Sequence, residues 1–136
     1  MNLGLGAQAK PQLEAVRAMV ADEITPLDDE FHRQVGCHPS GDRFQHTPRQ
    51  SEILSSLKDA AKARGLWNFW RTNSAQGPGL TNVEYAYFAE EMGKVRIAAE
   101  CFNCSAPDTG NMEVLASMGT SAHQERWLAP LLSGEI

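Results

Sequence analysis

Apolar residues recur every three or four positions along most of this chain, and no stretch alternates apolar and polar residues for long enough to indicate a strand. The first helix is expected to begin near residues 8–10, with Pro11 in its first turn. Its apolar stripe comprises Leu13, Val16, Val20, Ile24, Leu27 and Phe31. Pro26 lies within the same stretch and predicts a kink. The pattern therefore predicts an all-α protein, a bundle of about six helices.

Two capping boxes predict where the second and third helices begin. Thr47 and Gln50 form the first box, directly after a turn-rich loop at residues 36–46, and Thr81 and Glu84 form the second. In each box the hydroxyl accepts from a backbone amide that has no partner inside the helix. The longer side chain accepts in return from the backbone amide of the capping residue. The expected inward residues are Ile53, Leu57, Ala60, Ala61 and Leu66 for the second helix, which Gly65 ends, and Tyr85, Phe88, Ala89 and Met92 for the third, which Gly93 ends.

Three further helices are expected in the C-terminal half. The first spans residues 97–104, before a break caused by Pro107 and Gly110. Thr120 and Ser121 are alternative N-caps for the last helix. The expected inward side chains of the last two helices are Met112, Leu115, Met118, Trp127, Leu128, Leu131 and Leu132.

Length and charge narrow the class of protein. A chain of 136 residues is long enough for one domain with a single core. Twelve Lys and Arg against 17 Asp and Glu give a net charge of -5, which argues against nucleic acid as a partner. No apolar run is long enough for a membrane span and the N-terminus has no signal-peptide pattern, so we expect an intracellular protein, cytoplasmic in a bacterium. The three cysteines are expected to be reduced thiols.

Two short motifs resemble chemical sites but occur in the wrong context. Residues 4–9 match the dinucleotide pattern G-x-G-x-x-A, yet no buried strand can precede them, so a terminus leading into a helix is the expected structure. Cys101 and Cys104 form a C-x-x-C pair without a second pair. Small buried cysteines are the favoured interpretation, and a thiol or zinc protein is the alternative.

Other polar residues give no catalytic assignment. His32, Cys37, His38 and His46 include suitable zinc ligands, but their spacing matches no known finger, so no metal site is expected. The two carboxylates at residues 90–91 and the three at residues 28–30 are interpreted as solvent-exposed helix faces. His123 is expected at the surface. We therefore name no catalytic residue in this chain.

Several ordered segments resemble the N-terminal helical domain of the acyl-CoA dehydrogenase family of flavoproteins. They are Gly65-Leu66-Trp67, residues 79–85 (GLTNVEY) with 90–93 (EEMG), residues 118–120 (MGT) and residues 124–135 (QERWLAPLLSGE). The resemblance covers nearly the whole chain, which we take as one domain, residues 1–136. It implies that a middle strand domain and a C-terminal helical domain follow in a complete enzyme.

The resemblance implies oxidation of an acyl-CoA thioester to 2,3-enoyl-CoA, with FAD as hydride acceptor and a further electron-transfer acceptor. In this family the later domains supply most flavin contacts and the catalytic glutamate. The chain alone is therefore expected to bind no flavin stably and to be inactive, and the complete enzyme is expected to be a homo-oligomer.

The resemblance also gives candidate residues for the acyl pocket. The turn that matches the family's pocket-lining region offers Phe102, Asn103 and Ala106 as substrate-binding residues. The sequence of residues 101–110 differs from the pattern that is most common in the family. The alternative function is a free-standing helical interaction module without catalysis.

Overall fold

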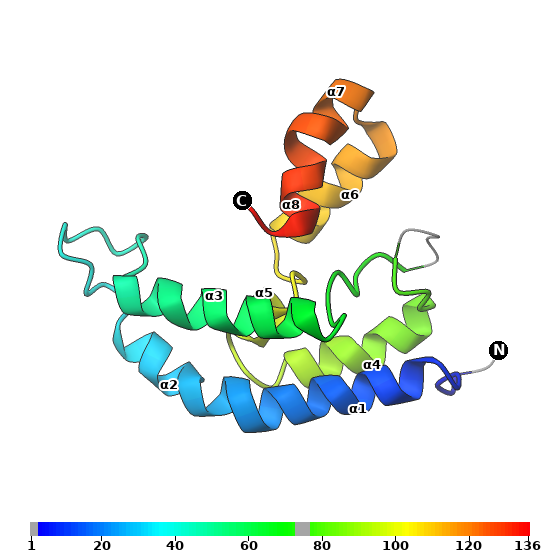
Figure 1. Cartoon of the computed structure of the whole chain (residues 1–136), viewed down its shortest axis with the longest axis horizontal. Coiled ribbons are helices and arrows are strands. Elements are labelled where there is room, and N and C mark those ends of the chain that lie inside the picture. The colour runs from blue at the N-terminus through cyan, green and yellow to red at the C-terminus, as the bar shows by residue number, and fades with distance from the viewer. Residues whose placement is uncertain (1–2, 73–76) are drawn as a thin grey trace.

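The computed structural model describes residues 3–72 and 77–136 (Figure 1). Within these residues the chain forms six continuous helical stretches and no strand, as predicted. They are α1 (Ala9–Met19) continued by η1 (Val20–Ile24) and α2 (Thr25–Arg33); α3 (Pro48–Ala63); α4 (Asn82–Met92); α5 (Ala98–Cys101); α6 (Asp108–Met118); and α7 (Ser121–His123) continued by η2 (Gln124–Leu128) and α8 (Ala129–Ser133). None of the described helices combines the length and apolar character that crossing a membrane requires.

Two prolines lie inside continuous helical stretches, and each follows a π-helical turn. Pro26 occupies the first turn of α2, directly after η1, where the amide of Thr25 donates to the carbonyl of Val20. Pro130 occupies the first turn of α8, directly after η2. A proline lacks the amide proton of an α-helical hydrogen bond and its ring clashes with the carbonyl four residues earlier. The wider π turn leaves room for the proline. At Pro26, where the sequence predicts a kink, the structure has this π-helical turn.

Both predicted capping boxes are present. The amide of Gln50 donates to Thr47 Oγ1 over 3.2 Å, and the amide of Thr47 donates to Gln50 Oε1 over 2.9 Å. In the second box the amide of Glu84 donates to Thr81 Oγ1 over 3.2 Å and the amide of Thr81 to Glu84 Oε2 over 2.9 Å. Gly65 follows α3 with a φ of +69°, a left-handed conformation suited to a helix stop. The local signals therefore position both helices correctly.

The main core lies among α1 to α5 and the segment at residues 66–70. Phe69, Phe88 and Phe102 are among its largest fully buried side chains. The rings of Phe69 and Phe88 lie 4.7 Å apart between centroids, and those of Phe69 and Phe102 lie 6.1 Å apart. We call residues 9–104 the body.

The helices α6 to α8 form a compact unit that stands off the body near the C-terminal end of α3 (Figure 1). We call this unit, residues 108–133, the arm. Its two buried apolar side chains among the described residues, Met112 and Leu128, are not members of the continuous core cluster. The arm therefore has a small apolar centre of its own.

Several expectations for the C-terminal half were wrong. The helix expected over residues 97–104 is only the four-residue α5, and Gly110 lies inside α6. A glycine costs a helix only about 1 kcal/mol relative to alanine, which neighbouring contacts offset. Met118, expected inside, is 84% exposed because α6 packs against the rest of the arm with one face only.

Further inward assignments need correction, and the structure selects one of the two N-cap alternatives. Trp127 is 45% exposed, and Ala89 on α4 is exposed. Thr120, rather than Ser121, caps the last helical stretch, since its hydroxyl accepts from the amide of His123. The carboxamide of Gln124 donates to carbonyls at the end of α6.

Candidate functional site

The three residues proposed to line an acyl pocket occupy different environments. Phe102 is fully buried and packs on Phe69 in the main core. Asn103 is half-buried at the point where the body leads toward the arm, and Ala106 is exposed two residues before α6. The structure thus places the three on one short turn but does not direct them into a common cavity. Their role in substrate binding stays a prediction.

The side chain of Asn103 is held by neighbouring polar groups. Its Nδ2 donates to Asn68 Oδ1 over 2.7 Å and to the carbonyl of Leu131 over 2.9 Å. Asn68 Nδ2 donates to the carbonyl of Leu132 over 3.0 Å. The indole Nε1 of Trp67 donates to the same carbonyl over 2.8 Å. Sequence reasoning missed Asn68, because its partners lie far away in the chain.

A cleft separates the body from the arm beside this turn. It has a volume of about 290 Å³ and is lined by Trp70, Arg71 and Thr72 on the body and by Glu113, Ala116 and Ser117 on the arm. The guanidinium of Arg71 lies 5.8 Å from the ring centre of Trp70. Trp70 Nε1 is buried without a hydrogen-bond partner among the described residues. Residues 73–76, which follow directly, lie outside the described part of the chain.

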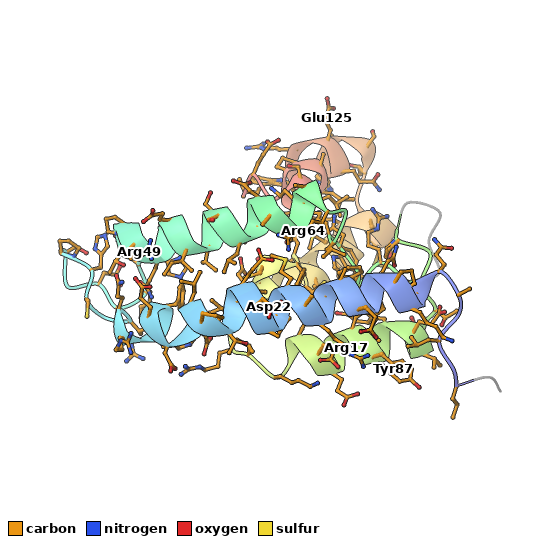
Figure 2. All side chains as sticks on the ribbon, turned by 60° about the horizontal axis from the view of Figure 1, so that its bottom comes forward. Arg17, Asp22, Arg49, Arg64, Tyr87 and Glu125 are labelled. Carbon is orange, nitrogen blue, oxygen red and sulfur yellow. The ribbon has the colours of Figure 1, made fainter. Side chains whose placement is uncertain are left out.

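The interpretation of residues 90–91 as a solvent-exposed pair was wrong for Glu91, which is only 6% exposed. Its carboxylate accepts from Arg17 Nε over 2.8 Å and from Lys94 Nζ over 2.6 Å. Figure 2 shows Arg17 on α1 beside α4. The hydrogen bond from Lys94 is the largest cause that holds the pKa of Glu91 below its ordinary value, against the opposing effect of burial, and Arg17 adds to it. A carboxylate held ionised in this way joins two helices and is poorly suited to act as a base.

The interpretation of residues 28–30 was wrong for Asp28, which is 8% exposed. Asp28 Oδ2 accepts from Arg96 Nε over 2.9 Å, and Oδ1 accepts from the amide of Ile97 over 3.3 Å. This carboxylate therefore ties α2 to the segment before α5. Asp29 is exposed, as expected.

The cysteines of the C-x-x-C pair have the properties of inert thiols. Cys101 is fully buried and Cys104 half-buried. Burial raises the pKa of Cys101 to about 12 and that of Cys104 to about 11, so both are protonated at neutral pH. Among the described residues, no three His, Cys, Asp or Glu side chains lie close enough together to hold a metal ion. His123 is exposed, as predicted.

The glycine-rich segment at residues 4–9 does not fit a dinucleotide. The amide of Gly6, which a pyrophosphate would need, donates to Glu84 Oε1 over 2.9 Å. The same carboxylate caps α4 through Thr81. A carboxylate in this place would repel phosphate, so these residues are unsuited to hold the pyrophosphate of FAD.

Comparisons with known proteins agree with this geometry. The family model described as acyl-CoA dehydrogenase, N-terminal domain, matches residues 8–135. The chain is 51% identical over 129 residues to FadE2 of Mycobacterium tuberculosis, described as a probable acyl-CoA dehydrogenase, and the match covers 90% of this chain and 31% of that protein. It is 49% identical to acyl-CoA dehydrogenase family member 11 of Mus musculus, where the match covers 91% of this chain and 15% of the relative.

A solved structure gives the same result for the fold. A protein from Mycobacterium abscessus, assigned to the acyl-CoA dehydrogenases, superimposes with a TM-score of 0.82 at 37% identity, over 98% of this chain and 33% of that one. The chain thus spans a third or less of the length of these relatives. On the match to residues 8–135, the chain belongs to the acyl-CoA dehydrogenase family and corresponds to its N-terminal helical domain.

Proposed function

We propose that this chain is the N-terminal domain of a flavin-dependent enzyme that oxidises an acyl-CoA thioester to 2,3-enoyl-CoA. The observation that carries the proposal is the family match over residues 8–135. The superposition on a solved relative at 37% identity supports it. In such an enzyme the flavin, when bound, accepts the hydride that leaves the acyl chain.

The residues of this chain would have a supporting task in that reaction. The two buried carboxylates of the described residues, Glu91 and Asp28, are engaged in ion pairs that tie helices together rather than poised to remove a proton. Residues 4–9 offer no cradle for FAD either, because Glu84 occupies the amide of Gly6. We therefore assign the flavin contacts and the catalytic base to other domains of a complete protein. To this domain we assign the wall of the acyl pocket near Asn103 and Ala106.

The partners follow from the same proposal. The complete enzyme would take an acyl-CoA substrate, pass its electrons to a separate acceptor and assemble as a homo-oligomer. Its location would be intracellular. Glu91, Asp28 and the capping boxes would keep the helices in place while the substrate is bound.

The test is anaerobic mixing of a complete protein that contains this chain with acyl-CoA thioesters of graded length. We expect the absorbance of its bound flavin to bleach with at least one of them. Protein that carries stoichiometric flavin but bleaches with none would overturn the proposal. A colourless complete protein that captures a protein partner would favour the interaction module instead.

The chain by itself gives a second test. Purified from a host that makes abundant flavin, residues 1–136 are expected to be colourless and to show no turnover. Stoichiometric FAD on the purified chain would contradict the assignment of the flavin site to other domains.

A further inference from the structure

The arm has an apolar centre that is separate from the core of the body. Met112 is fully buried and Leu128 is 7% exposed, yet neither belongs to the continuous core cluster of the body. The partly buried apolar side chains that pack against that cluster also end at Cys104. Buried apolar side chains that do not join into one cluster allow one part of a chain to move or unfold without the other.

Side-chain hydrogen bonds hold the arm on the body instead. Trp67 Nε1 and Asn68 Nδ2 donate to the carbonyl of Leu132 over 2.8 and 3.0 Å. Asn103 Nδ2 donates to the carbonyl of Leu131 over 2.9 Å. These carbonyls lie in the last turn of α8, where that of Leu131 also accepts from the amide of Gly134 over 3.2 Å. The last carbonyls of a helix lack partners within the helix, so side chains can bind them. The donors of the body thus cap the end of the arm.

The two asparagines are also bound to each other. Asn103 Nδ2 donates to Asn68 Oδ1 over 2.7 Å, and the amide of Asn68 donates to the carbonyl of Phe102 over 3.1 Å. Asn68 has a φ of +59° and Asn103 a φ of +55°. Asparagine tolerates this left-handed conformation better than most residues, and unlike glycine it also brings a carboxamide. Both turns therefore need a residue of this type for shape and for bonding.

Elsewhere in the junction, an open cleft and a close approach of the backbone limit the apolar contact between the arm and the body. The cleft of about 290 Å³ lies between the body and α6, and Trp70 is among the residues that line it. At the other end Gly134, with a φ of +72°, lies so close to Trp67 that a Cβ there would approach Cζ2 to 2.7 Å. The arm therefore meets the body through hydrogen bonds, the contact of Met112 Sδ with Asn103 Nδ2 at 3.9 Å and one close approach of the backbone.

From these observations we infer that the arm is a separately hinged element and that the Asn68–Asn103 carboxamide pair is the latch that fixes its orientation. Residues 105–107 form the hinge, because they alone join the body to α6 along the chain. Ala106 lies in the hinge and Asn103 just before it, so the latch also sets the position of the turn assigned to the acyl pocket. Only this last step rests on the proposed function.

Hydrogen exchange on the purified 136-residue chain tests the latch. Asn103→Gly and Asn68→Gly each remove a carboxamide and keep the left-handed φ accessible. We expect the slow amides of η2 and α8 to exchange about tenfold faster while those of α3 keep their wild-type rates. Asn111→Ala, which removes an exposed carboxamide from α6 outside the latch, is the matched control and is expected to change neither set.

Two results would overturn the inference. Equal acceleration in α3 and in the arm would show that both belong to one cooperative unit, and unchanged exchange in the arm would show that the carboxamides hold nothing. If a glycine variant fails to fold, Trp67→Phe removes one donor to the carbonyl of Leu132 and keeps the aromatic ring.

The double variant tests whether the two asparagines act as one device. If they form a single latch, the Asn68→Gly, Asn103→Gly chain exchanges in the arm about as fast as either single variant. Independent effects would multiply to about a hundredfold, and that outcome would overturn the pairing.

Discussion

Replacement of Glu91 by glutamine tests whether a buried carboxylate holds α1 against α4. The new carboxamide would still offer an oxygen to Arg17, but its amide group would face Lys94 without a negative charge. Breaking a fully buried ion pair costs about 3–5 kcal/mol, and an exposed one contributes about 0–1 kcal/mol. The side chains of Arg17 and Lys94 are 43% and 55% exposed and can regain water, whereas that of Glu91 is 8% exposed. We therefore expect Glu91→Gln to lower the free energy of unfolding by about 2 kcal/mol.

The effect should depend on pH with a definite sign. The pKa of Glu91 lies below its ordinary value of 4.5 in the folded chain. Its contribution is therefore fully present above pH 4.5 and is lost as the pH falls through the lowered folded value. The difference between wild type and Glu91→Gln should be largest near pH 7 and should shrink at about pH 3.

Urea unfolding followed by far-ultraviolet circular dichroism measures this difference at both pH values. Glu90→Gln, at the exposed neighbouring position, is the control and should change the free energy of unfolding by less than about 0.5 kcal/mol. Equal effects of the two variants near pH 7, or a Glu91→Gln effect that does not change with pH, would refute the reasoning.

Three further outcomes are expected. Phe88→Ala removes a fully buried ring that packs on another aromatic ring, and should cost about 3–5 kcal/mol in urea unfolding; a cost below about 1 kcal/mol would contradict the packing. Thr81→Ala removes the hydroxyl that caps α4 and should cost about 1 kcal/mol in the same assay, whereas no loss would mean that the cap contributes nothing. In a thiol titration of the native chain at neutral pH, exposed Cys37 should react first and Cys101 and Cys104 only in denaturant, because burial raises their pKa values to about 12 and about 11; three fast thiols would disprove this.

The sequence predicts what is local in this fold. A capping box needs two side chains three residues apart, so Thr47 and Thr81 mark the starts of α3 and α4 correctly. A left-handed helix stop needs only a glycine in the right place, as at Gly65. The weak points are the short helices α5 to α8, whose ends depend on how the arm packs.

The sequence pattern does not show which distant residues contact each other. Glu91 and Arg17 are 74 residues apart, and Asp28 and Arg96 are 68 apart, so neither carboxylate could be assigned a buried partner in advance. Adjacent charged residues on a helix usually face water, but here one carboxylate of each group, Asp28 or Glu91, is turned inward.

The candidate site also depends on a contact between distant residues. The resemblance to a family pointed to the turn at Asn103, and the structure places this residue in a junction between body and arm. Asn68 lies 35 residues away and gave no signal of its own. The acyl-pocket role of Phe102, Asn103 and Ala106 stays a prediction.

The π turn before Pro26 also explains how a long helix keeps one apolar side. Val16, Val20, Ile24 and Asp28 are buried at successive steps of four residues. In a regular α-helix each such step overshoots a full turn by about 40°, so three steps would rotate the buried side by about 120° toward water. A wider turn holds more residues and cancels part of this rotation. The buried side thus continues into α2, where Phe31 is buried and Leu27 packs against the core, and both lie on the apolar stripe that the sequence shows.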